Sequence, residues 1–439
     1  MGGEWRAVSL GDLFKIKHGF AFKGEYFTDQ PSPTVLVTPG NFAIGGGFQD
    51  QKRKYYQGPV PEDYVLKPGQ IVVTMTDLSK QSDTLGHAAR IPKDSNIWLH
   101  NQRVGLLVFN SGSPSVPRFI EYLLRSREYR SWVVGSATGT TVKHTSPGRI
   151  ESYRTRVPPL PEQRAIASIL GGLDDKIDLN RRMNETLEAM ARALFKDWFL
   201  DFGPTRAKLE GREPYLAPDL WAMFPDRLDD EGKPEGWEDV PFSSLVSIIG
   251  GGTPKTSVDA YWSGSVPWFS VVDTPPTGSV FVTDTEKKIT EAGLQGNSAR
   301  LVPVGTTIIS ARGTVGNLAV AGQPMTFNQS CYGLHGAEPV GDYFVYLASQ
   351  QMVGRLQSMA HGSVFSTITR QTFDSITFAR TEGPLLRSFE NSAAPLFARI
   401  LSGVRESKTL AQTRDLLLPQ LMSGEIRVRE AERMVEEVV

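Results

Sequence analysis

Cysteine and long apolar runs are the scarcest features of the sequence. A single thiol, Cys331, in 439 residues excludes an internal disulfide framework and is typical of a reducing compartment. No apolar run approaches the roughly 18 residues that a membrane-spanning helix needs, and the first residues lack the basic and then apolar order of a signal peptide. We therefore expect a cytoplasmic protein.

Histidine and net charge are also low. The six histidines are scattered without a cysteine or second histidine at ligand spacing, so we expect no metal site. The formal net charge of −1 argues by itself against strong nonspecific binding to nucleic acid. The charge is uneven, because residues 1–150 hold 18 Lys and Arg against 12 Asp and Glu, whereas residues 237–384 hold 8 against 11. DNA binding by the second half must therefore come from local patches or from basic partners.

The chain contains a tandem duplication. The pattern that starts at Trp5 returns 232 positions later at Trp237, and the pair Asn101-Gln102 returns as Asn328-Gln329. Between these landmarks, short apolar runs separated by Gly, Pro, Asp and Ser predict mainly β domains. The first copy illustrates this with expected strands at 34–37, 69–75 and 104–109 and one helix at 117–134, which recurs in the second copy at 342–358.

A long helix is predicted after each β domain. In residues 160–202 the apolar positions alternate at spacings of four and three, and the same frame returns 223 positions later. One such stripe is also what an amphipathic helix on an ordinary core shows. Two stripes in one frame favour a spacer of two paired helices about 60 Å long. The spacer seam comprises Ile166, Leu170, Leu173, Ile177, Leu187, Leu194, Trp198, Phe389, Leu396, Ile400, Leu410, Leu417 and Leu421.

The seam also holds polar positions, where Asn180 and Asn184 match Gly403 and Ser407 in frame. Polar residues at such positions lower stability but can fix register and orientation. In the second helix, prolines at 395 and 419 and the Ser-Gly pair at 402–403 predict a kink or a break. On the first helix, the outer face is expected to be left for partners. Its charged residues include Asp175, Asp178, Arg182 and Glu185.

These patterns predict an α+β fold in which two tandem mainly-β domains are each followed by a long helix. The two helices would pair as an antiparallel coiled-coil spacer with pseudo-twofold symmetry. The segments are domain 1 (1–158), the central spacer helix (159–202), a linker rich in Pro, Gly and charge (203–236), domain 2 (237–383), the C-terminal spacer helix (384–424) and a charged tail (425–439).

Two similar domains at the ends of a rigid helix pair have the geometry with which a dimeric DNA-binding protein contacts two half-sites. Three groups of residues are candidates for such DNA contact. A loop around residues 52–56 puts three cations beside two aromatic residues, which suits phosphates but equally suits a solvated charge run. The turns that follow one apolar strand in each copy, and the loops after each domain helix, supply hydroxyls and cations that suit phosphates or base edges, or else form ordinary turns. Arg312 is the residue we would choose to read a guanine. The candidates are Lys52, Arg53, Lys54, Tyr55, Thr76, Lys80, Thr140, Lys143, His144, Arg149, Lys255, Arg312, Thr314, Ser363, Thr367 and Arg370.

The two Asn-Gln pairs invite an adenine-reading hypothesis, because an amide can make two hydrogen bonds to adenine. Matched positions in two domains of different specificity should instead be structural. We therefore favour buried hydrogen-bonding roles for residues 101–102 and 328–329.

Motifs of DNA-modifying enzymes are not found in the sequence. The nearest approach to the Asn-Pro-Pro-aromatic motif of an adenine methyltransferase is Thr274-Pro-Pro-Thr, which reads as a turn. The glycine run at 250–252 follows an expected strand but precedes no helix that could hold a phosphate. We expect no catalytic residues in this chain.

Four runs of the helical segments carry a resemblance to a known family. They begin Leu160-Pro-Glu-Gln, Leu173-Asp-Asp-Lys, Phe195-Lys-Asp-Trp and Leu416-Leu-Leu-Pro. Together with the linker they resemble the specificity subunit of type I restriction-modification enzymes, and the resemblance covers essentially the whole chain. Pro395 and the weakly apolar middle of the second helix depart from the family pattern.

The resemblance implies a non-catalytic bacterial or archaeal subunit that recognises a bipartite site in double-stranded DNA. It would dock two methyltransferase subunits, which bind S-adenosylmethionine, and through them restriction and translocase subunits that use ATP and Mg; this chain itself would bind no cofactor. Two alternatives stay open. One is a protein-interaction scaffold that does not touch DNA, and the other is an orphan specificity chain in a phage-defence or phase-variable locus.

Overall fold

The computed structural model describes residues 4–50, 53–77, 79, 82–140, 142–276, 278–359 and 367–437. The fold is α+β, and the chain divides into two compact units. The first comprises residues 1–177 and 409–439, and the second comprises residues 178–408. Two long helices, α4 (Leu160–Phe199) and α10 (Gly383–Ser423), each contribute one part to each unit. The unit boundaries therefore fall inside the helices rather than at the ends of the predicted domains.

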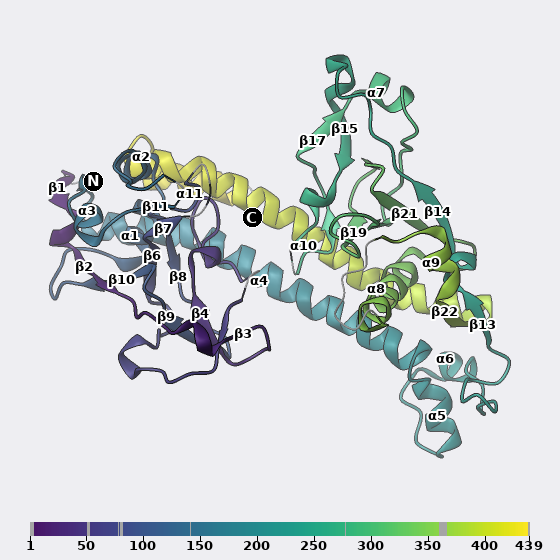
Figure 1. Ribbon diagram of the computed structural model, residues 1–439. Helices are drawn as coiled ribbons and strands as arrows, with labels where there is room; N and C mark the ends of the chain where they lie inside the picture. The colour runs from purple at the N-terminus through teal and green to yellow at the C-terminus, as the bar shows by residue number, and fades with distance from the viewer. Residues whose placement is uncertain are drawn as a thin grey trace. The chain divides into compact units, whose positions relative to one another are not determined.

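The first unit is built on two four-stranded sheets, in the orders β2-β10-β6-β8 and β3-β5-β4-β9 (Figure 1). Two further pairs, β1 with β12 and β7 with β11, are antiparallel. The strands are β1 (Arg6–Ser9), β2 (Phe14–His18), β3 (Phe27–Thr28), β4 (Thr34–Val37), β5 (Tyr55–Tyr56), β6 (Ile71–Thr74), β7 (Thr76–Asp77), β8 (Ala88–Arg90), β9 (Ile97–His100), β10 (Val104–Phe109), β11 (Lys143–His144) and β12 (Arg154–Val157); the short helices are α1 (Pro117–Leu123), α2 (Arg127–Gly135), α3 (Pro147–Glu151) and α11 (Val428–Glu436).

The second unit repeats this plan with a five-stranded sheet, β14-β21-β18-β19-β16, and a three-stranded sheet, β17-β15-β20. Its first and last strands, β13 and β22, pair as β1 and β12 do. The strands are β13 (Glu238–Pro241), β14 (Val246–Gly250), β15 (Trp262–Phe269), β16 (Phe281–Val282), β17 (Lys287–Ile289), β18 (Thr307–Ser310), β19 (Leu318–Ala321), β20 (Thr326–Phe327), β21 (Cys331–Gly336) and β22 (Thr377–Arg380); the helices are α5 (Gly203–Leu209), α6 (Pro218–Ala222), α7 (Glu291–Gln295), α8 (Asp342–Met359) and α9 (Arg370–Ser375).

A pair of glycines shows the duplication at atomic detail. A Cβ on Gly19 would lie 2.1 Å from the carbonyl oxygen of Asn101, and a Cβ on Gly251 would lie 2.0 Å from that of Asn328. Only glycine permits so close an approach of two backbones. Because both copies contain the same contact, the repeated Gly and Asn of the sequence are framework positions.

In the second unit, α4 and α10 pair antiparallel. The ring centroids of Trp198 and Phe389 are 5.7 Å apart, and the Asn180 side chain donates to Glu406 Oε2 (2.9 Å) and Ser407 Oγ (3.3 Å). The residue numbers therefore rise along one helix as they fall along the other. Asn180 is buried, and these bonds satisfy its amide.

The first unit also brings α4 and α10 into a shared core, because their seam residues pack with hydrophobic residues of the β domain. Across both units the structure buries nine of the predicted seam side chains and half-buries the other four. The buried ones are Ile166, Leu170, Leu173, Trp198, Phe389, Ile400, Leu410, Leu417 and Leu421, and the half-buried ones are Ile177, Leu187, Leu194 and Leu396.

Two details of the predicted helices are wrong. The helix expected over 117–134 is two helices, because Ser126 adopts an extended conformation (ψ 152°) and its side chain caps α2 by accepting from the Tyr129 N–H. This is the usual role of serine at a helix start. The helix expected to reach residue 202 ends at Phe199, since Phe202 takes the left-handed conformation (φ 55°) from which α5 begins.

Of the kink or break predicted in the second helix, the break is absent, because α10 runs without interruption through Pro395, residues 402–403 and Pro419. Proline removes one helical hydrogen bond. The neighbours Ala393, Phe397 and Ile400 are fully buried, and their packing holds the helix together across that gap. The linker contains the short helices α5 and α6, and the charged tail contains α11.

We expect Phe389→Ala to lower the stability of the second unit by about 3–5 kcal/mol, because a fully buried aromatic ring is removed from between the helices. Denaturant unfolding followed by fluorescence measures the loss. Met190→Ala, on an exposed side chain of α4 within the second unit, is the control and should change the stability by less than about 0.5 kcal/mol. Equal effects of both substitutions would contradict the packing role.

Candidate nucleic-acid interface

In the first unit, two predicted candidate segments lie side by side. Strand β7, which follows β6, pairs with β11 in the loop after α2, so that Thr76 faces His144. The Thr145 N–H donates to the Met75 carbonyl (3.0 Å), and Thr76 Oγ1 lies 3.2 Å from His144 Nδ1. Thr76 is buried and belongs to the framework, whereas His144 is exposed.

The second unit repeats this pairing with different side chains. Arg312 forms a bridge with Thr367, and the Ile368 N–H donates to the Ala311 carbonyl (2.9 Å). The Thr367 hydroxyl donates to the same carbonyl (3.0 Å). Arg312 and Thr314 are exposed. We call these two places, 76–77 with 143–145 and 312–314 with 367–368, the paired turns.

Asp77 stabilises the paired turn of the first unit through hydrogen bonds to its side chain. Its buried carboxylate accepts the N–H groups of Ser79 and Thr84 at 2.6 Å each and the Thr84 hydroxyl at 2.8 Å. Burial works against ionisation, but these hydrogen bonds bring the pKa of Asp77 below its usual value. Asp77 lies in one of the turns considered for DNA contact, but its buried role was not predicted, although Asp followed by Ser two residues later is a turn signal.

A second residue that was missed is Arg130 of α2. Its Nη2 donates to the carbonyl of Ser82 (2.7 Å) and lies 3.4 Å from that of Asp83. Ser82 takes a left-handed conformation (φ 58°), so the guanidinium holds a turn that the backbone alone does not favour. An arginine on a helix face gives no sequence signal of this use.

The arginines at the two short helices after the paired turns are used differently. Arg149 lies against Trp132, with its guanidinium carbon 3.8 Å from the ring centroid, and is half-buried. Arg370 is exposed, and its Nη2 lies 3.3 Å from the Ile248 carbonyl oxygen. Arg370 therefore presents more of its cation to solvent than Arg149 does.

The basic loop before β5 is engaged within its own unit. Arg53 is ion-paired with Asp50, which raises the pKa of Arg53 above its usual value. The Lys54 ammonium lies 4.3 Å from the centre of the Phe27 ring, and Tyr55 is half-buried in its sheet. These contacts favour the interpretation as a charged surface loop over a DNA-reading loop.

The remaining candidates are placed as follows. Thr140 and Lys255 are exposed and Lys143 is half-buried; Lys52, Lys80 and Ser363 lie outside the described residues.

The Asn-Gln pairs serve the framework, with one correction. The side-chain oxygens of Asn101 and Asn328 each accept the backbone N–H two residues on, from Arg103 (3.1 Å) and Ser330 (3.1 Å). These bonds close a turn in each copy. The two asparagines are half-buried, but the glutamines that follow them are exposed, so the predicted burial is wrong for the glutamines.

The charged outer face predicted on the first helix is partly occupied. Asp175 accepts hydrogen bonds from Arg118 and Arg90 of the first unit's β domain. In the second unit, Glu185 lies against Gly278 of that unit's β domain. Of the four residues named, two therefore contact the β domains, while Asp178 and Arg182 form an ion pair along the helix.

Among the described residues, no group of three His, Cys, Asp or Glu is arranged to hold a metal ion. Within the same part of the chain, every helix is too short or too polar to cross a membrane.

Both copies of the repeated domain match one known protein family. A sequence model of the type I restriction modification DNA specificity domain matches residues 2–189 and 234–379. These ranges cover most of both units, and the chain belongs to this family. It is a specificity protein of the type I restriction-modification class rather than one of its catalytic subunits.

Individual relatives agree with this assignment. The chain is 29% identical to the specificity subunit of the type I restriction enzyme HindI of Haemophilus influenzae, over 96% of this chain and 100% of that protein. It is 23% identical to the MjaIX specificity subunit of Methanocaldococcus jannaschii, over 72% and 70%. The crystal structure of the type I restriction-modification S subunit from M. genitalium shares the fold with a TM-score of 0.54 at 15% identity, covering 95% of this chain and 96% of that one.

We expect Asp77→Asn to lower stability at neutral pH by about 1–3 kcal/mol, because the amide cannot accept all three hydrogen bonds. The folded pKa of Asp77 is lowered, so its contribution is present above the unfolded value of about 3.9 and is lost as the pH falls through the folded value. The difference between variant and wild type should therefore shrink below about pH 4.

Thermal unfolding from pH 3 to pH 7 measures this difference. Asp29→Asn, on an exposed carboxylate of the same unit, is the control. A difference that stays constant over the whole pH range would show that the Asp77 charge contributes nothing.

Proposed function

We propose that this chain is the subunit that gives a type I restriction-modification enzyme its DNA sequence specificity, with each β domain reading one half of a bipartite site in duplex DNA. The observation that carries the proposal is the pair of turns. Both copies use the same backbone hydrogen bond, from Thr145 to Met75 and from Ile368 to Ala311. The exposed side chains mounted on that common frame differ. A common frame with different side chains is what two readers of different half-sites require.

The chemistry of the exposed side chains suits this task. Arg312 can donate two hydrogen bonds to the major-groove edge of a guanine. The hydroxyls of Thr314 and Thr367, and the imidazole of His144, suit base edges or phosphate oxygens. Since the second domain carries more acidic than basic residues, its binding to the DNA backbone would depend on such local groups and on partner subunits.

The paired helices α4 and α10 would set the number of base pairs between the two half-sites and dock two methyltransferase subunits. In that assembly S-adenosylmethionine binds to the methyltransferases, and ATP and Mg serve the restriction subunits, so this chain would hold no cofactor. We expect the assembly to work in the cytoplasm. The support is membership of the specificity family over most of the chain.

Exchange of residues 5–158 for the corresponding domain of another specificity subunit should change only one half of the recognised site. Mapping of methylated adenines in cells that express the chimaera with its methyltransferase measures the outcome. The unaltered chain with the same methyltransferase is the control. A change in both halves, or no bipartite methylated sequence from the unaltered chain, would contradict the proposed function, and the second result would favour a scaffold.

Arg312→Ala should relax the recognised sequence at one position of one half-site and weaken binding at that site by about 1–3 kcal/mol, because one bidentate base contact is lost. The same mapping, together with binding to duplexes that differ at that position, measures both effects. Arg300→Ala, on an exposed cation of the same unit, is the matched control. An equal loss of affinity for all sequences would mean that Arg312 contacts phosphate instead.

A further inference from the structure

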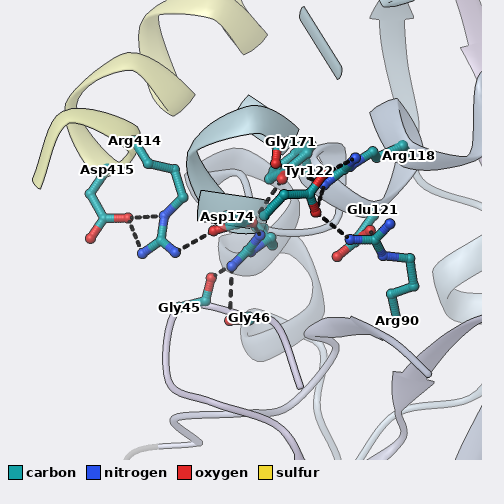
Figure 2. Close-up of polar contacts among 12 residues, drawn as sticks. Gly45, Gly46, Arg90, Arg118, Glu121, Tyr122, Gly171, Asp174, Arg414 and Asp415 are labelled. Carbon is teal, nitrogen blue, oxygen red and sulfur yellow. Dashed lines mark hydrogen bonds and ion pairs between the residues drawn. The ribbon is translucent and has the colours of Figure 1, made fainter. Parts of the chain in front are cut away.

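The carboxylate of Asp174 on α4 is the centre of a charged cluster in the first unit (Figure 2). It accepts hydrogen bonds from Tyr122 Oη (2.7 Å), Arg125 Nη1 (2.9 Å) and Arg414 Nη1 (2.6 Å). Burial opposes its ionisation, but the two guanidinium groups hold the pKa of Asp174 below its usual value. One carboxylate thus joins the β domain, α4 and α10.

Arg125 extends this connection to a loop of the β domain. Its side chain is 2% exposed, and it donates from Nε to the Gly45 carbonyl and from Nη2 to the Gly46 carbonyl, both at 2.9 Å. Gly46 has a φ of +89°, and a Cβ there would lie 2.5 Å from Arg125 Cγ. The loop around Gly46 therefore closes directly on the guanidinium that Asp174 holds.

Arg118 makes a second connection from the same β domain to α4. Its guanidinium donates to both carboxylate oxygens of Asp175, at 2.9 and 2.5 Å, and to the Gly171 carbonyl at 2.8 Å. Because bidentate arginine bonds are directional, they fix an orientation as well as a distance.

The second unit joins its β domain to the long helices with a different set of contacts. There the buried Glu188 of α4 accepts hydrogen bonds from Tyr346 Oη (3.1 Å) and Gln350 Nε2 (2.8 Å) of α8. At the offset of the long helices, 223 positions, Asp174 corresponds to Phe397, and an offset of 224 positions aligns Tyr122 with Tyr346. Tyr346 packs edge-on against Phe397, with ring centroids 5.6 Å apart. The counterparts of Arg125 and Arg414 at these offsets are an uncharged serine at 349 and an alanine at 191, both buried.

The glycine loop also has a counterpart in the second unit. Gly278, 232 positions after Gly46, has a φ of +80°. A Cβ there would lie 2.9 Å from Glu185 Cγ and 3.0 Å from Arg181 Cγ, both on α4. Each β domain thus places a glycine loop against its anchor on the spacer, through Arg125 in one unit and directly on the helix in the other.

The charges of the first unit bear on the orientation of its β domain more than on its stability. Buried ion pairs are generally no more stabilising than apolar packing of the same volume. Because the second unit packs a phenylalanine, a serine and an alanine at the same positions, the charges of the first unit are not needed to fill the space. What they add is a set of directional bonds.

We propose that Asp174 is a positioning residue. Through Arg125 and Arg414 it holds the first β domain at one orientation on α4 and α10, and on the proposed function this restricts the number of base pairs accepted between the half-sites. In the second unit, the ring contact of Tyr346 with Phe397 and the hydrogen bonds of Glu188 hold the β domain instead.

The test places side chains of the second unit at the corresponding positions of the first unit. A triple variant, Asp174→Phe with Arg125→Ser and Arg414→Ala, removes the charges together. Asp174→Asn keeps the shape and weakens the bonds, so it remains informative if the triple variant unfolds. Asp415→Asn is the matched control, because Asp415 is exposed and bonds Arg414 without touching the glycine loop.

The first measurement is the distance distribution between spin labels at Lys93→Cys and Leu416→Cys, two exposed positions of the first unit. The native Cys331 is buried and should stay unlabelled. We expect one narrow distribution in the wild type and the Asp415→Asn control, and a broader one in the Asp174 variants. An unchanged width in both Asp174 variants would overturn the positioning role, whatever the DNA result.

The second measurement maps methylated adenines in cells that express each variant with its methyltransferase. We expect the Asp174 variants to keep both half-site sequences and to modify in addition sites whose spacer is one base pair longer or shorter. A uniform loss at unchanged sites, or altered half-site sequences, would overturn the link to spacer length. If the wild type itself yields no bipartite sequence, the proposed function fails, while the label distances still decide the positioning role.

Discussion

The pairing of α4 and α10 is the constraint on which the rest of the structure depends. In the second unit, Phe195, Trp198 and Phe199 of α4 meet Phe389 of α10, and the same core continues into α8 through Phe344. In the first unit, the seam residues of both helices belong to one core with β2, β6 and α1. The largest core of each β domain therefore continues into both long helices, while smaller hydrophobic clusters lie wholly inside the domains.

This shared packing explains why the helices tolerate unfavourable local features. Pro395 lies in the interior of α10, and Asn180 is buried in the seam, yet the helices continue past both. Helices in proteins gain most of their stability from tertiary packing, so one lost backbone bond or one buried amide is offset by the apolar contacts around it. The amide also finds partners in Glu406 and Ser407, which makes the polar position specific to one alignment.

The features that repeat with a period could be predicted from the sequence. The heptad frame located both long helices, and the alternation of apolar runs and turn residues located strands such as β4 and β10. The duplication matched Asn101-Gln102 with Asn328-Gln329 and placed Arg312 and Thr367 among the candidates before the structure brought them together. These predictions depend on local spacing, which a sequence displays directly.

Contacts between side chains distant in sequence could not be predicted in the same way. Nothing near Arg125 indicates that it reaches Gly46 and Asp174, because those partners are 79 and 49 residues away. The division of the helix at Ser126 was missed because the apolar spacing continues across it. Arg53 was selected for its charge, although its carboxylate partner Asp50 was visible three residues earlier.

The main-chain hydrogen bonding of the paired turns affects how the exposed residues of such a protein can evolve. The hydrogen bonds that pair the two segments in each copy come from the main chain, and the exposed side chain of Arg312 takes no part in them. A substitution there alters the outward chemistry at little cost to folding. The exposed residues of the two copies can therefore diverge independently during evolution, while the backbone that carries them stays the same.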